Sequence, residues 1–260
     1  MFADANFCRE NVSRETFTVG ELELLKLQAA AWGLPLDRAR LTRLETFARL
    51  LSGYEEANVI GTRALRAILL DHILDSLSCF LFEPLSVARR LVDVGSGGGL
   101  PGIPIKIVAP KLEATLVESI AKKIRFLHRA VETLSLEGTT VTNARVEEIA
   151  RTGAHRGAYD IATARALARL SVVAEYCVPL LKVGGCTISM KGRLENDELS
   201  EGERAAEKLG ARVSALMRVP SLPEMGEKER CLVILEKMEE TPGEYPRNVG
   251  VPAKRPLGIV

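Results

Sequence analysis

The sequence has few of the residues that cross-link a fold or hold a metal. Its 260 residues include five cysteines and three histidines. The cysteines are odd in number, widely spaced and without a C-x-x-C pair, which argues against a disulfide framework and against a cysteine-rich zinc site. The histidines show no spacing typical of metal ligands. We therefore predict no metal site and expect the cysteines to be buried free thiols.

An excess of one charge and a long apolar run are also missing. With 35 Lys and Arg against 34 Asp and Glu, the formal net charge is +1, which argues against a binder dominated by electrostatics but allows a local basic patch. Polar residues interrupt the longest apolar stretch, 67–85, so no membrane span is predicted. The first residues lack the basic and apolar regions of a secretory signal. We expect a cytoplasmic protein.

The pattern of apolar residues changes once along the chain. From Val19 to about Leu85, apolar residues recur every three or four positions, which predicts helices. From Leu91 on, short apolar runs alternate with helical stretches, which is typical of a parallel sheet with crossover helices. Two late runs, 211–219 and 230–238, are close enough in sequence to predict an antiparallel pair. These patterns indicate a helical cap on a doubly wound α/β domain.

We divide the chain into four parts that form one integrated unit. They are a flexible extension (1–18), a helical cap (19–88), an α/β domain (89–238) and an irregular basic tail (239–260). Ligands of doubly wound sheets bind beyond the carboxyl ends of the strands, where the strand order reverses. We therefore expect the chemistry just after the ends of the first four strands, at Val94, Val117, Thr142 and Ala164.

A glycine-rich loop, DVGSGGGLPG at 93–102, follows the first of these strands. Glycine has no Cβ, so the backbone N–H groups of such a loop can approach a ligand closely. One register, Gly97, Gly99 and Gly102, matches the G-x-G-x-x-G fingerprint of dinucleotide-binding proteins. A second register, in which Asp93 precedes Gly95, Gly97 and Gly99, matches the D-x-G-x-G-x-G loop of methyltransferases that use S-adenosylmethionine.

Two features favour the methyltransferase register. Pro101 and Pro104 have no N–H to offer where a nucleotide-binding helix would present one to a pyrophosphate. The segment 182–185, KVGG, resembles a turn that is common before a late strand of methyltransferases.

Two carboxylates complete the predicted ligand site. Glu118 ends the second strand 23 residues beyond Gly95. This is close to the offset of about 20 residues at which a carboxylate accepts hydrogen bonds from ribose hydroxyls in this class of fold. Glu147 follows the third strand, in a region that usually flanks an adenine. A charge at the start of a helix would also explain Glu147, but beside the other two signals we place it in the site.

More motifs give the sequence a specific resemblance. The matching residues are Asn58, His72-x-x-Asp75-Ser76-Leu77, Glu118-Ser119, Lys122-Lys123-x-Arg125, Arg145-Val146-Glu147-Glu148, Thr163-Ala164-Arg165-Ala166, Pro179-Leu180, Pro246-Arg247 and Pro252-x-Lys254. From about Val19 to the tail, the chain resembles the bacterial small-subunit ribosomal RNA guanine-N7 methyltransferase G family, also called glucose-inhibited division protein B. Glu118 departs from the family, because many members carry Asp at that position; the carboxylate is kept.

The resemblance implies a fold, an activity and a partner. The fold would be α/β, a Rossmann-like class I methyltransferase with a seven-stranded, mostly parallel sheet and an N-terminal helical cap. The activity would be methyl transfer from S-adenosylmethionine to N7 of a guanosine in small-subunit (16S) ribosomal RNA. In the family, loss of this activity is associated with low-level streptomycin resistance. The partner would be that RNA or the small ribosomal subunit. We expect a monomer without a protein partner.

The resemblance also implies site residues. Cofactor contacts would come from Gly95, Gly97, Leu100, Glu118, Val146, Glu147 and Arg165. Arg165, at the end of the fourth strand, is also the candidate catalytic residue: it could contact the cofactor, the guanine edge or a phosphate, or be a salt-bridged strand end. Candidates for RNA binding are Lys122, Lys123, Arg125, Lys191 and Arg193. We interpret His72, Asp75 and Ser76 as a buried polar joint between cap and sheet.

The predicted reaction needs little catalytic machinery. Guanine N7 carries a lone pair and no proton at neutral pH, so no general base is required and catalysis can rest on positioning. The N-P-P-Y motif of exocyclic-amine methylation and the Pro-Cys pair of cytosine-C5 methylation are both missing from the sequence. Alternatives are a methyltransferase for another acceptor, an NAD-dependent oxidoreductase that uses Gly97, Gly99 and Gly102, and a non-catalytic ribosome-assembly factor.

Overall fold

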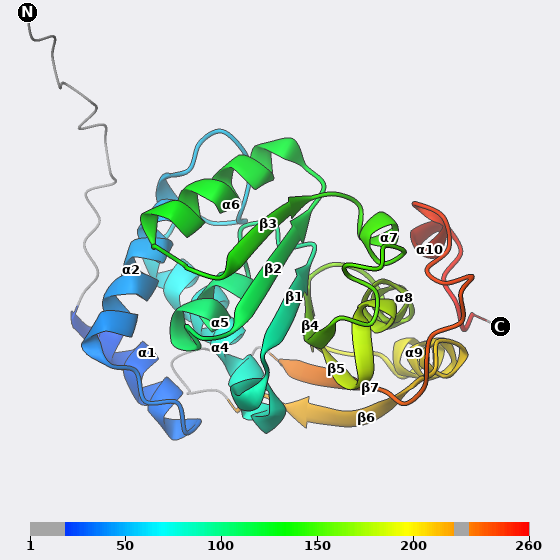
Figure 1. Ribbon diagram of the computed structural model, residues 1–260. Helices are drawn as coiled ribbons and strands as arrows, with labels where there is room; N and C mark the ends of the chain where they lie inside the picture. The colour runs from blue at the N-terminus through cyan, green and yellow to red at the C-terminus, as the bar shows by residue number, and fades with distance from the viewer. Residues whose placement is uncertain (1–18, 221–228, 260) are drawn as a thin grey trace, which may run out of the picture.

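A seven-stranded sheet runs through the middle of the computed structural model, which describes residues 19–220 and 229–259 (Figure 1). The strands are β1 (Arg90–Val94), β2 (Glu113–Glu118), β3 (Thr139–Asn143), β4 (Tyr159–Arg165), β5 (Leu181–Lys191), β6 (Ala211–Arg218) and β7 (Cys231–Lys237). All seven coincide with the apolar runs of the sequence.

The strand order is β3-β2-β1-β4-β5-β7-β6. Strands β1 to β5 pair in parallel, and β7 is antiparallel to both β5 and β6. The mostly parallel sheet and the late antiparallel pair are therefore confirmed. Because the order reverses between β1 and β4, the carboxyl ends of these two strands form the switch point at which a ligand is expected.

The burial of the strands explains their sequences. Strand β1 is buried from Leu91 to Val94, since helices cover both faces of the sheet, and it therefore has no polar face. Strand β6 lies at the edge of the sheet, where buried or half-buried residues alternate with exposed ones along most of its length. Its exposed positions include Arg212 and Arg218, and charged residues at an edge disfavour pairing with another chain.

Helices cover the two faces of the sheet (Figure 1). On one side lie α1 (Val19–Ala31), α2 (Arg38–Gly53), α3 (Leu65–Ala67), the π-helix η1 (Ile68–Leu74), α4 (Asp75–Leu77), the 3-10 helices η2 (Ser78–Leu81) and η3 (Glu83–Val87), α5 (Gly102–Val108) and α6 (Ala121–Thr133). On the other side lie α7 (Val146–Ile149), α8 (Leu170–Cys177), the 3-10 helix η4 (Val178–Leu180), α9 (Asn196–Lys208) and α10 (Val251–Lys254).

The N-terminal helices share one hydrophobic core with the helices of the sheet domain. Phe47 and Tyr54 pack against Phe126 of α6, with ring centroids 6.5 and 4.9 Å apart. The same cluster joins α1, α2 and η1 to α5 and α6. The helices predicted from Val19 onward are confirmed, except that α2 ends at Gly53, after which Tyr54 is extended and a loop runs to residue 64.

The segment 182–185 is not the turn that its sequence resembles. It belongs to β5, whose pairing with β4 shifts from Tyr159–Leu181 to Ile161–Cys186. The extra residues form a bulge in which Gly184 adopts a φ of 81°, a conformation that is open to glycine without strain. The expectation of a turn was wrong because a bulge and a turn use the same residue types.

The C-terminal segment lies against α7 and α8 and is held by buried charge. Arg247 forms a two-pronged ion pair with Glu175, whose side chain is fully buried, at 2.6 and 2.9 Å. Arg156 donates to the carbonyl oxygens of Thr241 and Tyr245, each at 2.7 Å. The tail predicted for 239–260 is thus fixed to the domain over its described residues and contains one short helix, α10.

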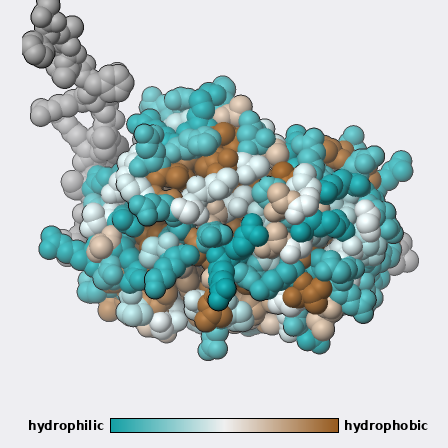
Figure 2. Space-filling model, in the orientation of Figure 1, coloured by the Kyte–Doolittle hydropathy of each residue, from teal (hydrophilic) through white to brown (hydrophobic). Residues whose placement is uncertain are grey.

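The structure bears on the predictions about the cysteines and about membrane spans. Cys79, Cys177, Cys186 and Cys231 are buried and free, which confirms the expectation for these four thiols; Cys8 and the predicted extension 1–18 lie outside the described residues. In the described ranges, no helix is long and apolar enough to cross a membrane. The face drawn in Figure 2 is mostly hydrophilic, with hydrophobic residues in small patches.

Candidate active site

Two pockets open where the carboxyl ends of the parallel strands meet. The smaller, about 320 Å³, lies beyond β1 and β2 and is lined by Gly95, Glu118 and Val146, among others. The larger, about 620 Å³, lies beyond β4 and β5 and extends below the helices η1 and α4. Ala166 lines both pockets, so they meet at the end of β4, next to the switch point of the sheet.

Asp93 holds the glycine loop from below. One oxygen of its carboxylate accepts a hydrogen bond from the backbone N–H of Gly102 at 3.1 Å, and the other accepts from the Thr163 hydroxyl at 2.8 Å. The side chain is fully buried, and this burial raises the pKa of Asp93 to about 6. Asp93 therefore ties the two ends of the loop together and connects it to β4.

Two glycines of the loop stand where no side chain fits. Gly95 has a φ of 70°, and a Cβ on it would lie 2.6 Å from the Leu167 side chain. At Gly102 a Cβ would lie 2.6 Å from Leu116 and 2.8 Å from the Asp93 carboxylate. The loop therefore needs glycine at 95 for the positive φ and at 102 for the close approach to β2 and to Asp93.

Glu118 joins the end of β2 to the loop. Its carboxylate accepts hydrogen bonds from the backbone N–H of Gly97 at 3.1 Å, of Ser119 at 2.7 Å and of Ile120 at 2.9 Å. A carboxylate can accept about four hydrogen bonds, so these three leave it capacity for a hydroxyl in the smaller pocket, which Glu118 lines.

Glu147 also lines the smaller pocket, but it anchors the C-terminal segment as well. It is 4% exposed, and its carboxylate accepts a hydrogen bond from the backbone N–H of Gly250 at 2.9 Å. Burial, together with the charge of Glu147, raises the pKa of Tyr176 to about 12. Tyr176 and Ala253 of α10 line the same pocket, and no motif in the sequence predicts a role for either residue.

The other residues predicted for the cofactor lie at different depths. The side chain of Leu100 is buried in the core shared with α2 and α6 and is not among the residues that line the smaller pocket. Lys123, predicted for RNA, does line it. Arg125 of the same helix forms an exposed ion pair with Glu56 at 3.1 Å.

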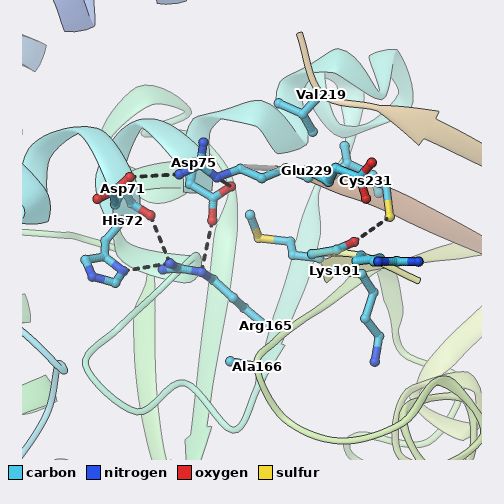
Figure 3. Close-up of a pocket in the computed structure, with 14 residues that line it drawn as sticks. Asp71, His72, Asp75, Arg165, Ala166, Lys191, Val219, Glu229 and Cys231 are labelled. Atoms are coloured by element: carbon cyan, nitrogen blue, oxygen red, sulfur yellow. Dashed lines mark hydrogen bonds and ion pairs between the residues drawn. The ribbon is translucent and has the colours of Figure 1, made fainter. Parts of the chain in front are cut away.

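Arg165 points into the larger pocket (Figure 3). Its Nε lies 3.1 Å from the Asp75 carboxylate, and its Nη2 donates to the carbonyl oxygen of Asp71 at 3.2 Å. Nη2 also lies 2.7 Å from Nδ1 of His72. Since a guanidinium group only donates, His72 accepts through Nδ1. The predicted contact of His72 and Asp75 with the sheet is confirmed, whereas the Ser76 hydroxyl donates to the His72 carbonyl oxygen of its own helix.

Arg230, at the start of β7, completes this group and had not been predicted. It pairs with Asp71 at 2.9 Å and with Asp75 at 3.3 Å. Lys191 lines the same pocket and pairs with Glu198 at 2.8 Å, with 14% of its side chain exposed. Arg193, also in the lining, is 76% exposed. The two basic residues predicted after β5 therefore border the larger pocket at different depths.

These features define the class of the protein. The strand order with an antiparallel β7, the glycine loop after β1 and the carboxylate at the end of β2 are those of a Rossmann-like class I methyltransferase. A solved structure of similar fold is geranyl diphosphate methyltransferase in complex with S-adenosylmethionine, with a TM-score of 0.50 and 15% identity over 72% of this chain and 94% of that one.

Sequence comparison shows the family. The model of the rRNA small subunit methyltransferase G family matches residues 40–225. Two relatives of that name come from Rubrobacter xylanophilus, 58% identical over 90% of each chain, and from Roseiflexus castenholzii, 40% identical over 90% of this chain and 99% of the relative. The chain belongs to this family and is an S-adenosylmethionine-dependent methyltransferase. This membership favours the register of Asp93, Gly95, Gly97 and Gly99 for the glycine loop over the dinucleotide-binding register.

Proposed function

We propose that the protein transfers a methyl group from S-adenosylmethionine to N7 of a guanosine in small-subunit ribosomal RNA. The observation that carries this proposal is the meeting of two pockets at Ala166, one suited to the cofactor and one to a base. Family membership supports ribosomal RNA as the substrate.

The chemistry of the residues around the smaller pocket supports a cofactor site there. Glu118 has capacity left to accept a hydrogen bond from a ribose hydroxyl, Gly95 brings the backbone to the pocket without a side chain, and Val146 offers an apolar wall to the adenine. Gly97 does not line the pocket and acts through its N–H, which holds the Glu118 carboxylate. We propose these residues as cofactor contacts, with Leu100 acting through its backbone and Glu147 shaping the wall through Gly250. When bound, the cofactor supplies a methyl group on a positively charged sulfur, open to attack by a lone pair.

The larger pocket supplies orientation. Guanine N7 needs no proton removed, so the residues around it have to hold the base with N7 toward Ala166 rather than act as a base. Arg165, directly before Ala166 in the chain, is the residue that we propose to contact the acceptor at this boundary. Lys191, held by Glu198, is placed to fix the backbone of the same nucleotide.

The remaining basic residues are proposed to follow the RNA outside the pockets. Lys123 lies at the smaller pocket and Arg193 at the larger one, and Lys122 and Arg125 continue along α6. Phosphate contacts of this kind supply salt-sensitive affinity. With a net charge of +1, we propose that a structured RNA or the small ribosomal subunit is recognised by shape as well as by charge. We further propose that the protein acts as a cytoplasmic monomer.

The test is a transfer assay with labelled S-adenosylmethionine. Small ribosomal subunits and protein-free 16S RNA, both lacking N7 methylation, are incubated with the protein, and the RNA is digested to nucleosides. We expect label in 7-methylguanosine and in no other nucleoside. Label in another nucleoside would overturn the acceptor, and no label from a protein that binds S-adenosylhomocysteine would overturn the substrate.

A further inference from the structure

Four charged residues from three distant segments form one network at the larger pocket. Asp71 and Asp75 come from the helical cap and Arg165 from the end of β4 (Figure 3). Arg230 directly precedes β7. The Asp75 carboxylate lies between both guanidinium groups, 3.1 Å from Nε of Arg165 and 3.3 Å from Nε of Arg230. The ion pairs among these four residues therefore join two guanidinium groups and two carboxylates.

The network fixes the direction of the Arg165 guanidinium. Its Nε and Nη2 face the cap, through Asp75, His72 and the carbonyl oxygen of Asp71. Within the described ranges, Nη1 of Arg165 has no hydrogen-bond partner, although the residue lines the larger pocket. The pair with Asp75 is largely withdrawn from solvent, since the two side chains are 16% and 12% exposed. A guanidinium group is planar, so contacts at Nε and Nη2 also fix the direction of Nη1.

The chemistry of guanine gives this fixed donor a use. Guanine presents N7 and O6 side by side as its two acceptors on one edge. A donor beside the reacting N7 therefore meets O6, and adenine would place an amino group there instead. A donor at this point discriminates in favour of guanine.

The charge of Arg165 also needs balancing during the reaction. Methylation at N7 moves a positive charge from the cofactor onto the base, and an unpaired guanidinium beside the base would oppose this transfer. A carboxylate in contact with Arg165 cancels most of that repulsion. Asp75 can do so because its carboxylate lies 3.1 Å from Nε of Arg165, where the cap borders the same pocket.

We propose that Asp75 is a positioning residue for the acceptor base: it directs Arg165 toward guanine O6 and neutralises it while N7 becomes cationic. This inference rests on the proposed function. Because Asp75 acts through Arg165, its substitution should change the rate of methyl transfer and the selection of the base. Cofactor affinity is set in the smaller pocket, which Asp75 does not line.

The first experiment replaces Asp75 by Asn in the full chain. We expect kcat for labelling of small-subunit RNA to fall on the order of 100-fold, the cost of misplacing a reacting group by about 1 Å. The Kd of S-adenosylhomocysteine, measured by calorimetry, should stay within about twofold because the smaller pocket is unchanged. Asp75→Glu keeps the charge and should recover part of the lost kcat. Circular dichroism and thermal melting check that each variant is folded.

A double-mutant cycle separates positioning from general stability. If Asp75 acts through Arg165, then Asp75→Asn costs about twofold or less in an Arg165→Gln background, because coupled residues are not additive. An equal loss in both backgrounds would overturn the proposal, as would unchanged kcat in folded Asp75→Asn. Glu236→Gln serves as control, because it breaks an ion pair with Arg212 on the far edge of the sheet, and should leave kcat unchanged.

The wild-type protein distinguishes the two proposals. If it places label in 7-methylguanosine and Asp75→Asn does so equally well, the positioning role fails and the proposed function stands. If the wild type places no label there, the proposed function itself fails.

Discussion

Replacement of Asp93 by Asn should change how the stability of the protein depends on pH. Asp93 is fully buried below the glycine loop, and burial raises the pKa of its carboxyl from 3.8 to about 6. Hydrogen bonds from Thr163 and Gly102 act in the opposite direction but do not cancel the cost of burial. The folded protein therefore takes up a proton at a pH at which the unfolded chain has already lost it.

The raised pKa fixes the sign and the size of the effect. The stability that Asp93 contributes is fully present below pH 3.8 and is lost as the pH rises through about 6. A difference of about two pKa units corresponds to about 3 kcal/mol over the whole range. Between about pH 5 and about pH 7.5 the linkage relation gives a loss of about 1.4 kcal/mol.

The assay is urea unfolding of the wild type and of Asp93→Asn at several pH values. The single amide oxygen of Asn can accept from the Thr163 hydroxyl but not from the Gly102 N–H at the same time. The lost hydrogen bond should lower the free energy of unfolding by about 1–3 kcal/mol at every pH. The free energy of unfolding of the wild type minus that of the variant should rise by about 1.4 kcal/mol between about pH 7.5 and about pH 5, because only Asp93 titrates. A difference that is the same at all pH values would refute the reasoning.

Three further substitutions test the loop and its surroundings. Glu118→Gln loses an acceptor for the Gly97 N–H and for a ribose diol, so the Kd of S-adenosylhomocysteine in calorimetry should rise about tenfold or more; an unchanged Kd would remove Glu118 from the cofactor contacts. Arg247→Ala leaves the fully buried Glu175 carboxylate unpaired and should lower the free energy of unfolding by about 3–5 kcal/mol in urea; a loss below about 1 kcal/mol would mean that the tail detaches without cost. Gly102→Ala forces a Cβ against the Asp93 carboxylate at 2.8 Å and should cost about 1–3 kcal/mol, seen as a lower melting temperature, which an unchanged melting temperature would contradict.

Much of the fold could be predicted because its signals are local. The central strands β1, β2 and β4 are short, mostly apolar runs that are buried almost throughout, and each run is readable without its partners. The glycine loop is contiguous in sequence, so its motif is readable although some of its glycines, such as Gly95 and Gly98, are limited by the distant residues Leu167 and Val59. Glu118 lies at a characteristic sequence distance from the loop, because the loop and Glu118 belong to the same β1-α5-β2 unit. The bulge at Gly184 escaped prediction, since its residues also suit a turn.

The larger pocket could be predicted only in part because it is assembled from distant segments. Asp71 and Arg230 are 159 positions apart, and their ion pair depends on how the cap docks on the sheet. Asp71 precedes Asp75 by one helical turn, so the shared face of the helix was a signal that went unused. Tyr176 and Ala253 meet at the smaller pocket only because the C-terminal segment folds back over α8. No periodicity in the sequence encodes that return.

The geometry at Ala166 explains how two ligands can be held by separate groups of side chains and still meet. Among the described residues Ala166 alone lines both pockets, and its φ of 49° is left-handed, a conformation that costs a non-glycine residue about 1–2 kcal/mol. The left-handed residue turns the chain sharply after β4, so that Arg165 lines the larger pocket while Leu167 and Ala168 line the smaller one. Under the proposed function, the methyl group would pass from one pocket to the other beside this short stretch of backbone. It follows that substitutions around Asp75 should act on the base and those around Glu118 on the cofactor, and that the strain at Ala166 is stored where the two must be aligned.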